Sequence, residues 1–314
     1  MPTRYDYMTV DVFTERPFSG NPVAVMTDAR GLSTEAMHAI AAEFNYSEST
    51  FVLPPDDPAH TAKVRIFTPK DEIPFAGHPN IGTAFAVALL AERAGKTLGP
   101  TLLFEEGAGL VPVDLLLGSD GRVAGATLTA PQPLTLGQNI PPAVVAECVG
   151  LEPGSLVTSQ HEPVIASVGL PFVIAEVSPD ALGRAVPDTG AFARAADRFP
   201  TRSLRFSVHL YARVGGEAEL RARMFAPLSG VPEDPATGSA NGALAGLLTS
   251  LAPERDVALD FDIRQGVEMG RPSRLTAAAE KRDGSVTRVR VGGHCVVMME
   301  GTFTVQPRHS GERH

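Results

Sequence analysis

The chain has 314 residues, 43% of them hydrophobic and 20% charged, which is typical of a soluble globular protein. Its net charge of −9 provides no basic surface, so neither nucleic acid nor an anionic membrane is expected as a partner. Cys148 and Cys295 are isolated, as in a reduced cytoplasmic protein. We expect no secretory leader, and the longest apolar runs are too short to cross a bilayer.

The first half of the chain predicts short strands around two helices. One helix is expected over residues 32–44, where the apolar spacing is helical and Ser33 is a suitable N-cap. The other follows Pro79 and is apolar on nearly all sides. Strands are expected at residues 7–13, 23–26, 51–53, 63–68, 102–117 and 122–129.

The second half predicts short helices and further strands, and it ends in a predicted hairpin around Gly292 and Gly293. Residues 308–314 are expected to form a frayed tail. Helices are expected at 141–148, 179–184, 190–198 and after Pro235, and strands at 164–167, 172–177, 204–213, 219–225, within 261–273, at 286–291 and at 295–303.

One sequence pattern occurs twice. Residues 77–84 (GHPNIGTA) and 233–240 (EDPATGSA) share the order His or Asp, Pro, two residues, Gly, Thr or Ser, Ala. The segments before them, VRIFTP at 64–69 and ARMFAP at 222–227, are also alike. An internal repeat of this kind predicts two similar halves.

The many strands and few helices indicate an α+β fold of two pseudo-symmetric domains. The first domain is expected to comprise residues 1–128 and 286–307, and the second residues 129–285.

Each copy of the repeat resembles a helix start. Asp234 is a favoured N-cap residue, Pro suits the next position, and His78 occupies the matching place in the other copy. Gly82 and Gly238 suggest a close approach to the backbone. A buried helix N-terminus attracts anions, so two such termini facing each other would bind a small carboxylate, with His78 and Asp234 beside it. The alternative is that both residues only cap their helices.

Five motifs in order resemble the phenazine-biosynthesis isomerase (PhzF-like) family over nearly the whole chain. They are DVFT with SGNP at 11–22, NYSEST at 45–50, FAGHP at 75–79, EDPATGSA at 233–240, and QG with MGRPS at 265–273. The resemblance implies a diaminopimelate-epimerase-like fold, in which each domain is a curled, mostly antiparallel sheet around a central helix. It also implies a homodimer.

The same resemblance implies cofactor-independent isomerisation of a small carboxylate, such as trans-2,3-dihydro-3-hydroxyanthranilate, by proton transfer. Glu48 corresponds to the glutamate that moves the proton, and His78 and Asp234 correspond to its polar partners. A buried Glu can reach the raised pKa that this chemistry needs. The residues expected to bind the substrate are Gly77, Asn80, Ile81, Gly82, Gly238 and Ser239. The pair Asn80-Ile81 stands where Thr or Ala followed by Leu or Ile is expected, so Asn80 departs from the pattern.

Three rivals remain open. A two-cysteine amino-acid racemase or epimerase of this fold would need thiols where His78 and Asp234 stand. A hydrolase with Ser239 as nucleophile lacks the Gly-x-Ser-x-Gly spacing. A non-catalytic binder of small molecules is the third. We expect no metal or nucleotide cofactor, because neither ligand spacings nor a phosphate-binding loop is present.

Overall fold

The computed structural model describes residues 3–201, 206–216 and 218–305, and the predicted tail at 308–314 lies outside them. The chain forms two compact units. Unit 1 contains residues 1–12, 22–126 and 295–314, and unit 2 contains residues 13–21 and 127–294. The domain division expected from the sequence assigned 13–21 and 286–294 to the first half and stays a prediction.

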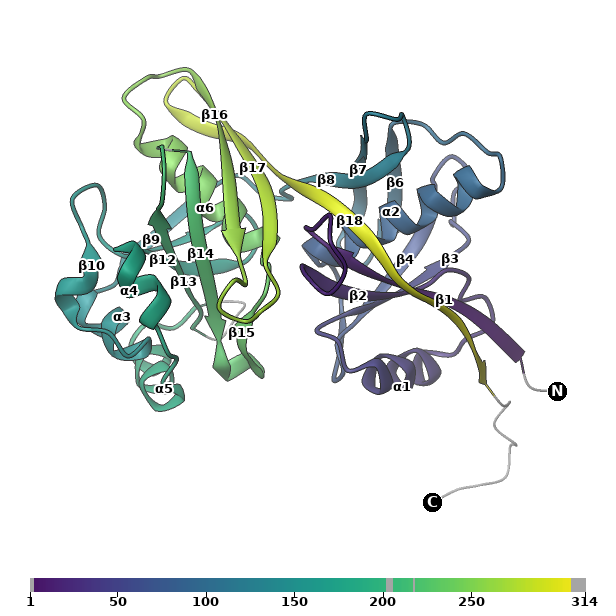
Figure 1. Cartoon of the computed structure of the whole chain (residues 1–314), viewed down its shortest axis with the longest axis horizontal. Coiled ribbons are helices and arrows are strands. Elements are labelled where there is room, and N and C mark those ends of the chain that lie inside the picture. The colour runs from purple at the N-terminus through teal and green to yellow at the C-terminus, as the bar shows by residue number, and fades with distance from the viewer. Residues whose placement is uncertain (1–2, 202–205, 217, 306–314) are drawn as a thin grey trace. The chain divides into compact units, whose positions relative to one another are not determined.

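Unit 1 is a mostly antiparallel set of strands that packs on two helices (Figure 1). Helix α2 (Gly77–Arg93) contacts β1, β3 and β7, and α1 (Thr34–Phe44) contacts β3 and β4. The strands are β1 (Thr3–Val12), β2 (Asn21–Met26), β3 (Ser49–Leu53), β4 (Ala62–Phe67), β5 (Glu72–Ile73), β6 (Thr101–Glu106), β7 (Gly109–Leu117), the first part of β8 (Val123–Thr129) and the end of β18 (Ser285–Val305).

The two helices of unit 1 cover opposite faces of β3. Phe51 packs with Met37 of α1 in one apolar cluster, whereas the hydroxyl of Thr50 hydrogen-bonds to Thr83 of α2. Because successive side chains of a strand point to opposite faces, these contacts place the helices on the two sides. Ser33 caps α1 as predicted, accepting a hydrogen bond from the Ala36 N–H.

Unit 2 surrounds a second buried helix, α6 (Gly238–Leu251), which packs on strands β11, β12, β16 and β17. The helices α3 (Pro142–Cys148), α4 (Pro179–Arg184) and α5 (Thr189–Arg198) share a separate apolar core with β12 and β13. The strands are β9 (Thr135–Asn139), β10 (Leu156–Val157), β11 (Val164–Ser167), β12 (Pro171–Val177), β13 (Val208–Arg213), β14 (Glu219–Ala226), β15 (Val231–Asp234), β16 (Val257–Gln265) and β17 (Ser273–Arg282).

The structure confirms the α+β class and the two buried helices, but it corrects the predicted closing hairpin. Residues 285–305 form one continuous strand, β18, and Gly292 and Gly293 lie within it. Its first part pairs with β17 and its last part with β1. A Cβ on Gly293 would lie 2.8 Å from Phe13 Cδ1 and 3.1 Å from the Arg274 carbonyl oxygen. This glycine therefore allows a close approach rather than a turn.

The single strand predicted over residues 102–117 is also wrong. The segment is an antiparallel pair, β6 and β7, joined at Gly107 and Ala108. Gly109 has a φ of +110°, which favours glycine, and the turn is tied to the chain before α2 by a hydrogen bond from the Ala108 N–H to the Pro74 carbonyl. The break follows Glu105 and Glu106 and contains Gly107, a turn signal that the prediction overlooked.

Candidate active site

Glu48 and His78 lie close together in unit 1. Glu48 Oε2 is 3.7 Å from His78 Nε2, which is an ion-pair distance but too long for a hydrogen bond. The side chains are 20% and 9% exposed, respectively. The structure thus brings together two residues that stand 30 positions apart in the sequence and that were predicted to act in one reaction.

The position of Glu48 follows from the local fold. Helix α1 ends at Phe44, and Asn45 has the left-handed conformation, with its N–H donating to the Ala41 carbonyl. The chain then turns and enters β3 at Ser49. The buried hydrogen bond between Thr50 and Thr83, 2.7 Å long, fixes the start of β3 against α2, and so it holds Glu48 near the start of that helix.

Burial raises the pKa of Glu48 above its ordinary value, and the neighbouring Ser47 side chain opposes this shift. Burial has this effect because a charged carboxylate loses its hydration there. A carboxyl group with a raised pKa can both give and take a proton near neutral pH. Glu48 therefore has the raised pKa that is expected of a proton-transfer group.

His78 is not the N-cap of α2, as the repeat had suggested. The helix begins at Gly77, its N-cap is Ala76, and no side chain of the described residues caps it. Pro79 is tolerated in the first turn because no backbone N–H is needed there. The N–H of Gly77, the first residue of the helix, has no acceptor within the helix, whereas the N–H groups of Ile81 and Gly82 fall within the helical hydrogen-bonding pattern.

Asp234 in unit 2 is not an N-cap either. It ends β15, and α6 begins four residues later, with Thr237 as its N-cap. Asp234 Oδ1 accepts a hydrogen bond from Asn21 Nδ2 at 3.0 Å, and Oδ2 accepts one from the Thr237 hydroxyl. Asp234 is 8% exposed and is held as an oriented acceptor. Capping alone therefore explains neither His78 nor Asp234.

Gln265 organises the loop between Asp234 and α6. Its Nε2 donates to the Asp234 carbonyl at 2.8 Å and to the Thr237 hydroxyl at 3.1 Å. Its Oε1 accepts from Asn241 Nδ2 at 2.7 Å and from the Thr237 N–H. The next residue, Gly266, has a φ of +72°, and a Cβ there would lie 2.6 Å from the Pro235 carbonyl oxygen.

The network continues into the core of unit 2 through His209. Its Nε2 lies 3.1 Å from Asn241 Oδ1, and burial lowers the pKa of His209 to about 4. His209 is therefore neutral near pH 7, and its N–H can donate to Asn241. This histidine supports the start of α6 through hydrogen bonding and carries no charge there.

The predicted substrate-binding residues differ in their surroundings. A Cβ on Gly77 would meet nothing within 4 Å, whereas one on Gly82 would lie 2.5 Å from a Val23 methyl group. The close approach predicted at Gly82 is thus to the packed strands of unit 1. Asn80 and Ile81 are buried, Gly238 and Ser239 form the first turn of α6, and the binding roles of all six residues remain predictions.

Sequence reasoning missed Asn21, Thr237 and Gln265 as residues that orient Asp234. All three lie in motifs that carried the family resemblance. Their side chains act over separations of up to 213 residues, as between Asn21 and Asp234, and this pairing could be recognised only from the fold.

Comparison with known proteins identifies the family. The model of the phenazine biosynthesis-like protein family (PhzC-PhzF) matches residues 10–301. The chain belongs to this family. It is 38% identical over 299 residues to the trans-2,3-dihydro-3-hydroxyanthranilate isomerase of Pseudomonas aeruginosa, covering 94% of this chain and 98% of that one.

Solved structures give the same result for the fold. A PhzF-family protein of Bacillus anthracis matches with a TM-score of 0.84 at 25% identity, covering 97% of this chain and 100% of that one. A hydroxyproline epimerase from Agrobacterium vitis matches with a TM-score of 0.62 at 14% identity, covering 98% and 93%. The epimerase-like fold is therefore confirmed, and the PhzF-like protein is an isomerase, as several of its relatives are named.

Proposed function

We propose that this isomerase moves a proton within a small carboxylate substrate, with Glu48 as the acid and base. The observation that carries the proposal is the placement of Glu48, whose buried Oε2 lies 3.7 Å from His78 and whose pKa is raised by burial. No cofactor is needed for this step, because one carboxyl group can take a proton from one carbon and return it to another.

The partner groups have different tasks. His78 lies at an ion-pair distance from Glu48, and it stabilises the charge that Glu48 carries after giving up a proton. Asp234, with both oxygens accepting hydrogen bonds, orients a donor of the substrate rather than exchanging protons. The backbone N–H of Gly77, in the first turn of α2, can bind a carboxylate or a developing oxyanion.

The first candidate substrate is trans-2,3-dihydro-3-hydroxyanthranilate, because the relative in Pseudomonas aeruginosa is named for it. The wider class is small carboxylates, including cyclic amino carboxylates.

A two-thiol racemase is disfavoured. The positions that it would need hold His78 and Asp234, and burial raises the pKa of Cys148 to about 12, which keeps that thiol unreactive.

The test is hydrogen exchange in D₂O, followed by NMR, with dihydro-hydroxyanthranilate and a panel of other small carboxylates and amino acids. We expect exchange at a substrate C–H that Glu48→Gln abolishes. Glu43→Gln, on the exposed side of α1, is the matched control and keeps the exchange. Exchange that survives Glu48→Gln would remove Glu48 from its role. A protein that binds these compounds without exchange would be the non-catalytic binder.

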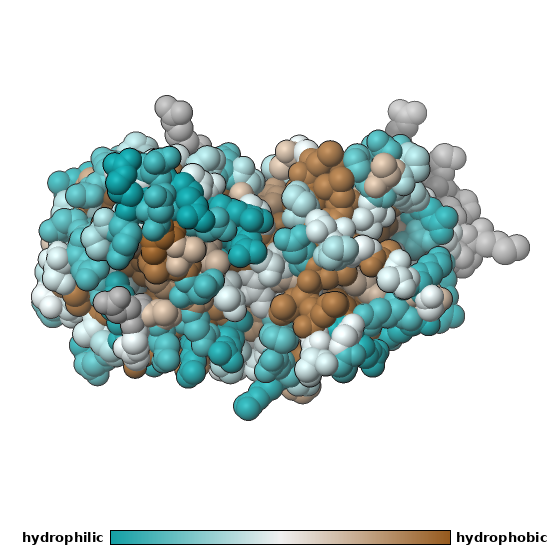
Figure 2. Space-filling view, turned by 90° about the horizontal axis from the view of Figure 1, so that it is seen from above, coloured by the Kyte–Doolittle hydropathy of each residue, from teal (hydrophilic) through white to brown (hydrophobic). Residues whose placement is uncertain are grey.

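A cytoplasmic homodimer is the proposed form of the protein, following the family resemblance. Figure 2 shows apolar residues in patches among polar ones on one face, and the exposed large apolar side chains include Leu110, Leu117 and Leu136. No helix among the residues described is long and apolar enough to span a membrane. Sedimentation equilibrium at micromolar concentration tests the dimer, and a mass of 33.1 kDa would contradict it.

A further inference from the structure

Glu106 is a buried carboxyl group that the proposed reaction leaves unused. It ends β6, one residue before the turn to β7. Both of its carboxyl oxygens are buried, and neither has a hydrogen-bond partner among the residues that the structure describes. An unsatisfied buried carboxyl is costly, so its retention in this position calls for a role.

Asn80, in the first turns of α2, has the same unsatisfied state. It is fully buried, and both its Nδ2 and its Oδ1 lack hydrogen-bond partners within the described part of the chain. Asn80 adjoins Glu106 closely enough to lower the pKa of that carboxyl slightly, although the pair makes no hydrogen bond of normal geometry. Two unsatisfied polar groups therefore lie beside each other near the start of α2.

Backbone contacts pack the turn after Glu106 against the segment that leads into α2. The Ala108 N–H donates to the Pro74 carbonyl at 3.0 Å, and a Cβ on Gly107 would lie 3.0 Å from Pro74 Cα. The turn after Glu106 is thus packed against the segment that leads into Gly77 and α2. This contact places Glu106 beside the start of α2, the helix that carries both His78 and Asn80.

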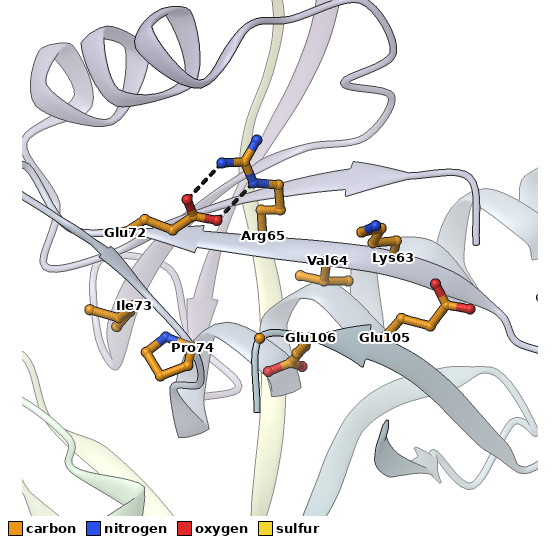
Figure 3. A pocket seen from close by; sticks show the side chains of 9 residues that line it. Lys63, Val64, Arg65, Glu72, Ile73, Pro74, Glu105 and Glu106 are labelled. Carbon is orange, nitrogen blue, oxygen red and sulfur yellow. Dashed lines mark hydrogen bonds and ion pairs between the residues drawn. The ribbon is translucent and has the colours of Figure 1, made fainter. Parts of the chain in front are cut away.

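The other charged groups around Glu106 are already paired. They line a cavity of about 410 Å³ (Figure 3), where Arg65 binds Glu72 and where Glu105 and Glu106 extend from successive positions of β6. Glu105 is bound by His60 and two backbone N–H groups, and Lys63 is bound by Asp56. On α2, His78 stands two positions before Asn80, and it contacts Glu48.

We propose that Glu106 is a positioning residue that orients the side-chain amide of Asn80 for substrate binding. In its neutral form Glu106 donates its O–H to Asn80 Oδ1, which leaves Asn80 Nδ2 available as a donor to an anionic substrate. In its ionised form Glu106 instead accepts from Nδ2, which turns the donor away from the substrate. Burial supports this assignment, since it raises the pKa of Glu106 to about 8. The identity of the ligand rests on the proposed function. The change of hydrogen bonding between Glu106 and Asn80 with pH does not.

The coupling between the protonation of Glu106 and the side-chain amide of Asn80 is tested without any ligand. In protein labelled with ¹³C and ¹⁵N, the Glu106 carboxyl and the Asn80 side-chain amide are followed by NMR from pH 5 to 10. We expect both signals to shift with one common midpoint near 8. Glu106→Gln removes the shift of Asn80, and Glu72→Gln, which changes another carboxyl of the same cavity, leaves it in place. An Asn80 amide that does not respond to Glu106, or a Glu106 carboxyl that is ionised at pH 6, would overturn the proposal.

Substrate binding is tested with trans-2,3-dihydro-3-hydroxyanthranilate by calorimetry at pH 7 and pH 9. If only the form with neutral Glu106 binds, the Kd rises about tenfold between these values, because the competent fraction falls by that factor. In Glu106→Gln the Kd does not rise. A Kd that rises equally in both proteins, or no binding at all, would overturn the substrate role of the pair. Exchange that survives Glu48→Gln would instead overturn the proposed function and leave the NMR result unaffected.

Discussion

The starts of α2 and α6 come from the same repeated sequence pattern, yet they are stabilised in different ways. At α6, Asn21, Thr237 and Gln265 hold Asp234 and the preceding loop in a nearly complete hydrogen-bond network. At α2, the polar groups of Asn80 and Glu106 are buried without such partners among the residues that the structure describes. A complete hydrogen-bond network holds its side chains in one geometry. Buried polar groups without partners are instead typical of sites that bind ligands and that have shifted pKa values. This difference agrees with the proposed function, in which Glu48 and His78 beside α2 react and Asp234 before α6 only orients.

Replacement of the reacting group has the largest expected effect. Glu48→Gln should lower kcat by about 10²- to 10⁴-fold, the range that a general acid–base group contributes. Asp234→Asn keeps the size of the side chain and should cost less, because its role is to orient. Steady-state kinetics of the two variants measures the difference. A larger loss from Asp234→Asn would reverse the division of tasks between the two helix starts.

The second effect is on stability as a function of pH. The pKa of Glu106 is raised from 4.5 to about 8 in the folded protein, so the folded state holds its proton more tightly than the unfolded state does. The stabilisation is complete below pH 4.5 and is lost as the pH rises towards 8. The loss should be at most about 5 kcal/mol, and Glu106→Gln should remove it. Urea unfolding of both proteins at pH 5 and pH 8 is the measurement, and parallel pH profiles would contradict the expectation.

The third prediction compares what Gln265 and Asn80 contribute to the free energy of unfolding. Gln265→Leu leaves the Asn241 amide and the Thr237 N–H without their acceptor, and it should destabilise unit 2 by about 2–3 kcal/mol. Asn80→Leu removes only the one interaction with Glu106, and it should cost less, no more than about 1 kcal/mol. Hydrogen exchange of the α6 and α2 amides reports the two effects separately. Equal losses would show that Asn80 is as firmly bonded as Gln265.

The smallest effects concern the matching glycines. A Cβ at Gly82 would press on Val12 and Val23, so Gly82→Ala should cost about 1–3 kcal/mol. A Cβ at Gly238 would meet Phe13 at an ordinary 3.5 Å, so Gly238→Ala should be neutral or stabilising by up to about 1 kcal/mol. Thermal unfolding measures both variants. Similar Tm changes would mean that the two glycines serve the same purpose.

The sequence predicted the fold class and the two buried helices because the repeat and the apolar runs are local signals. It also predicted the neighbours Glu48 and His78, through motifs whose order resembles that of the family. The helix boundaries were less accessible, since His-Pro and Asp-Pro look alike in sequence. A His-Pro or Asp-Pro pair can lie inside the first turn of the helix or before it. Which of the two occurs depends on side chains such as Thr237 and Gln265.

The remaining errors have one physical cause. Gly292 and Gly293 suggested a turn, but tertiary packing against Phe13 also requires glycine in an extended strand. Glu106 attracted no attention in the sequence, because a Glu at the end of a strand is usually solvated. Its burial results from the contact between the β6–β7 turn and Pro74, two segments that are about 30 residues apart.

The continuity of β18 has a consequence for synthesis on the ribosome. Strand β1, at the very start of the chain, pairs along its whole length with residues 295–305 near the end. Unit 2 has all its residues once position 294 has emerged, whereas unit 1, which begins first, must wait for the last strand. Strand β1 therefore lacks this neighbour until residues 295–305 have been made, and an unpaired strand edge invites aggregation in that time. The part of the protein that is made first is the part that is completed last.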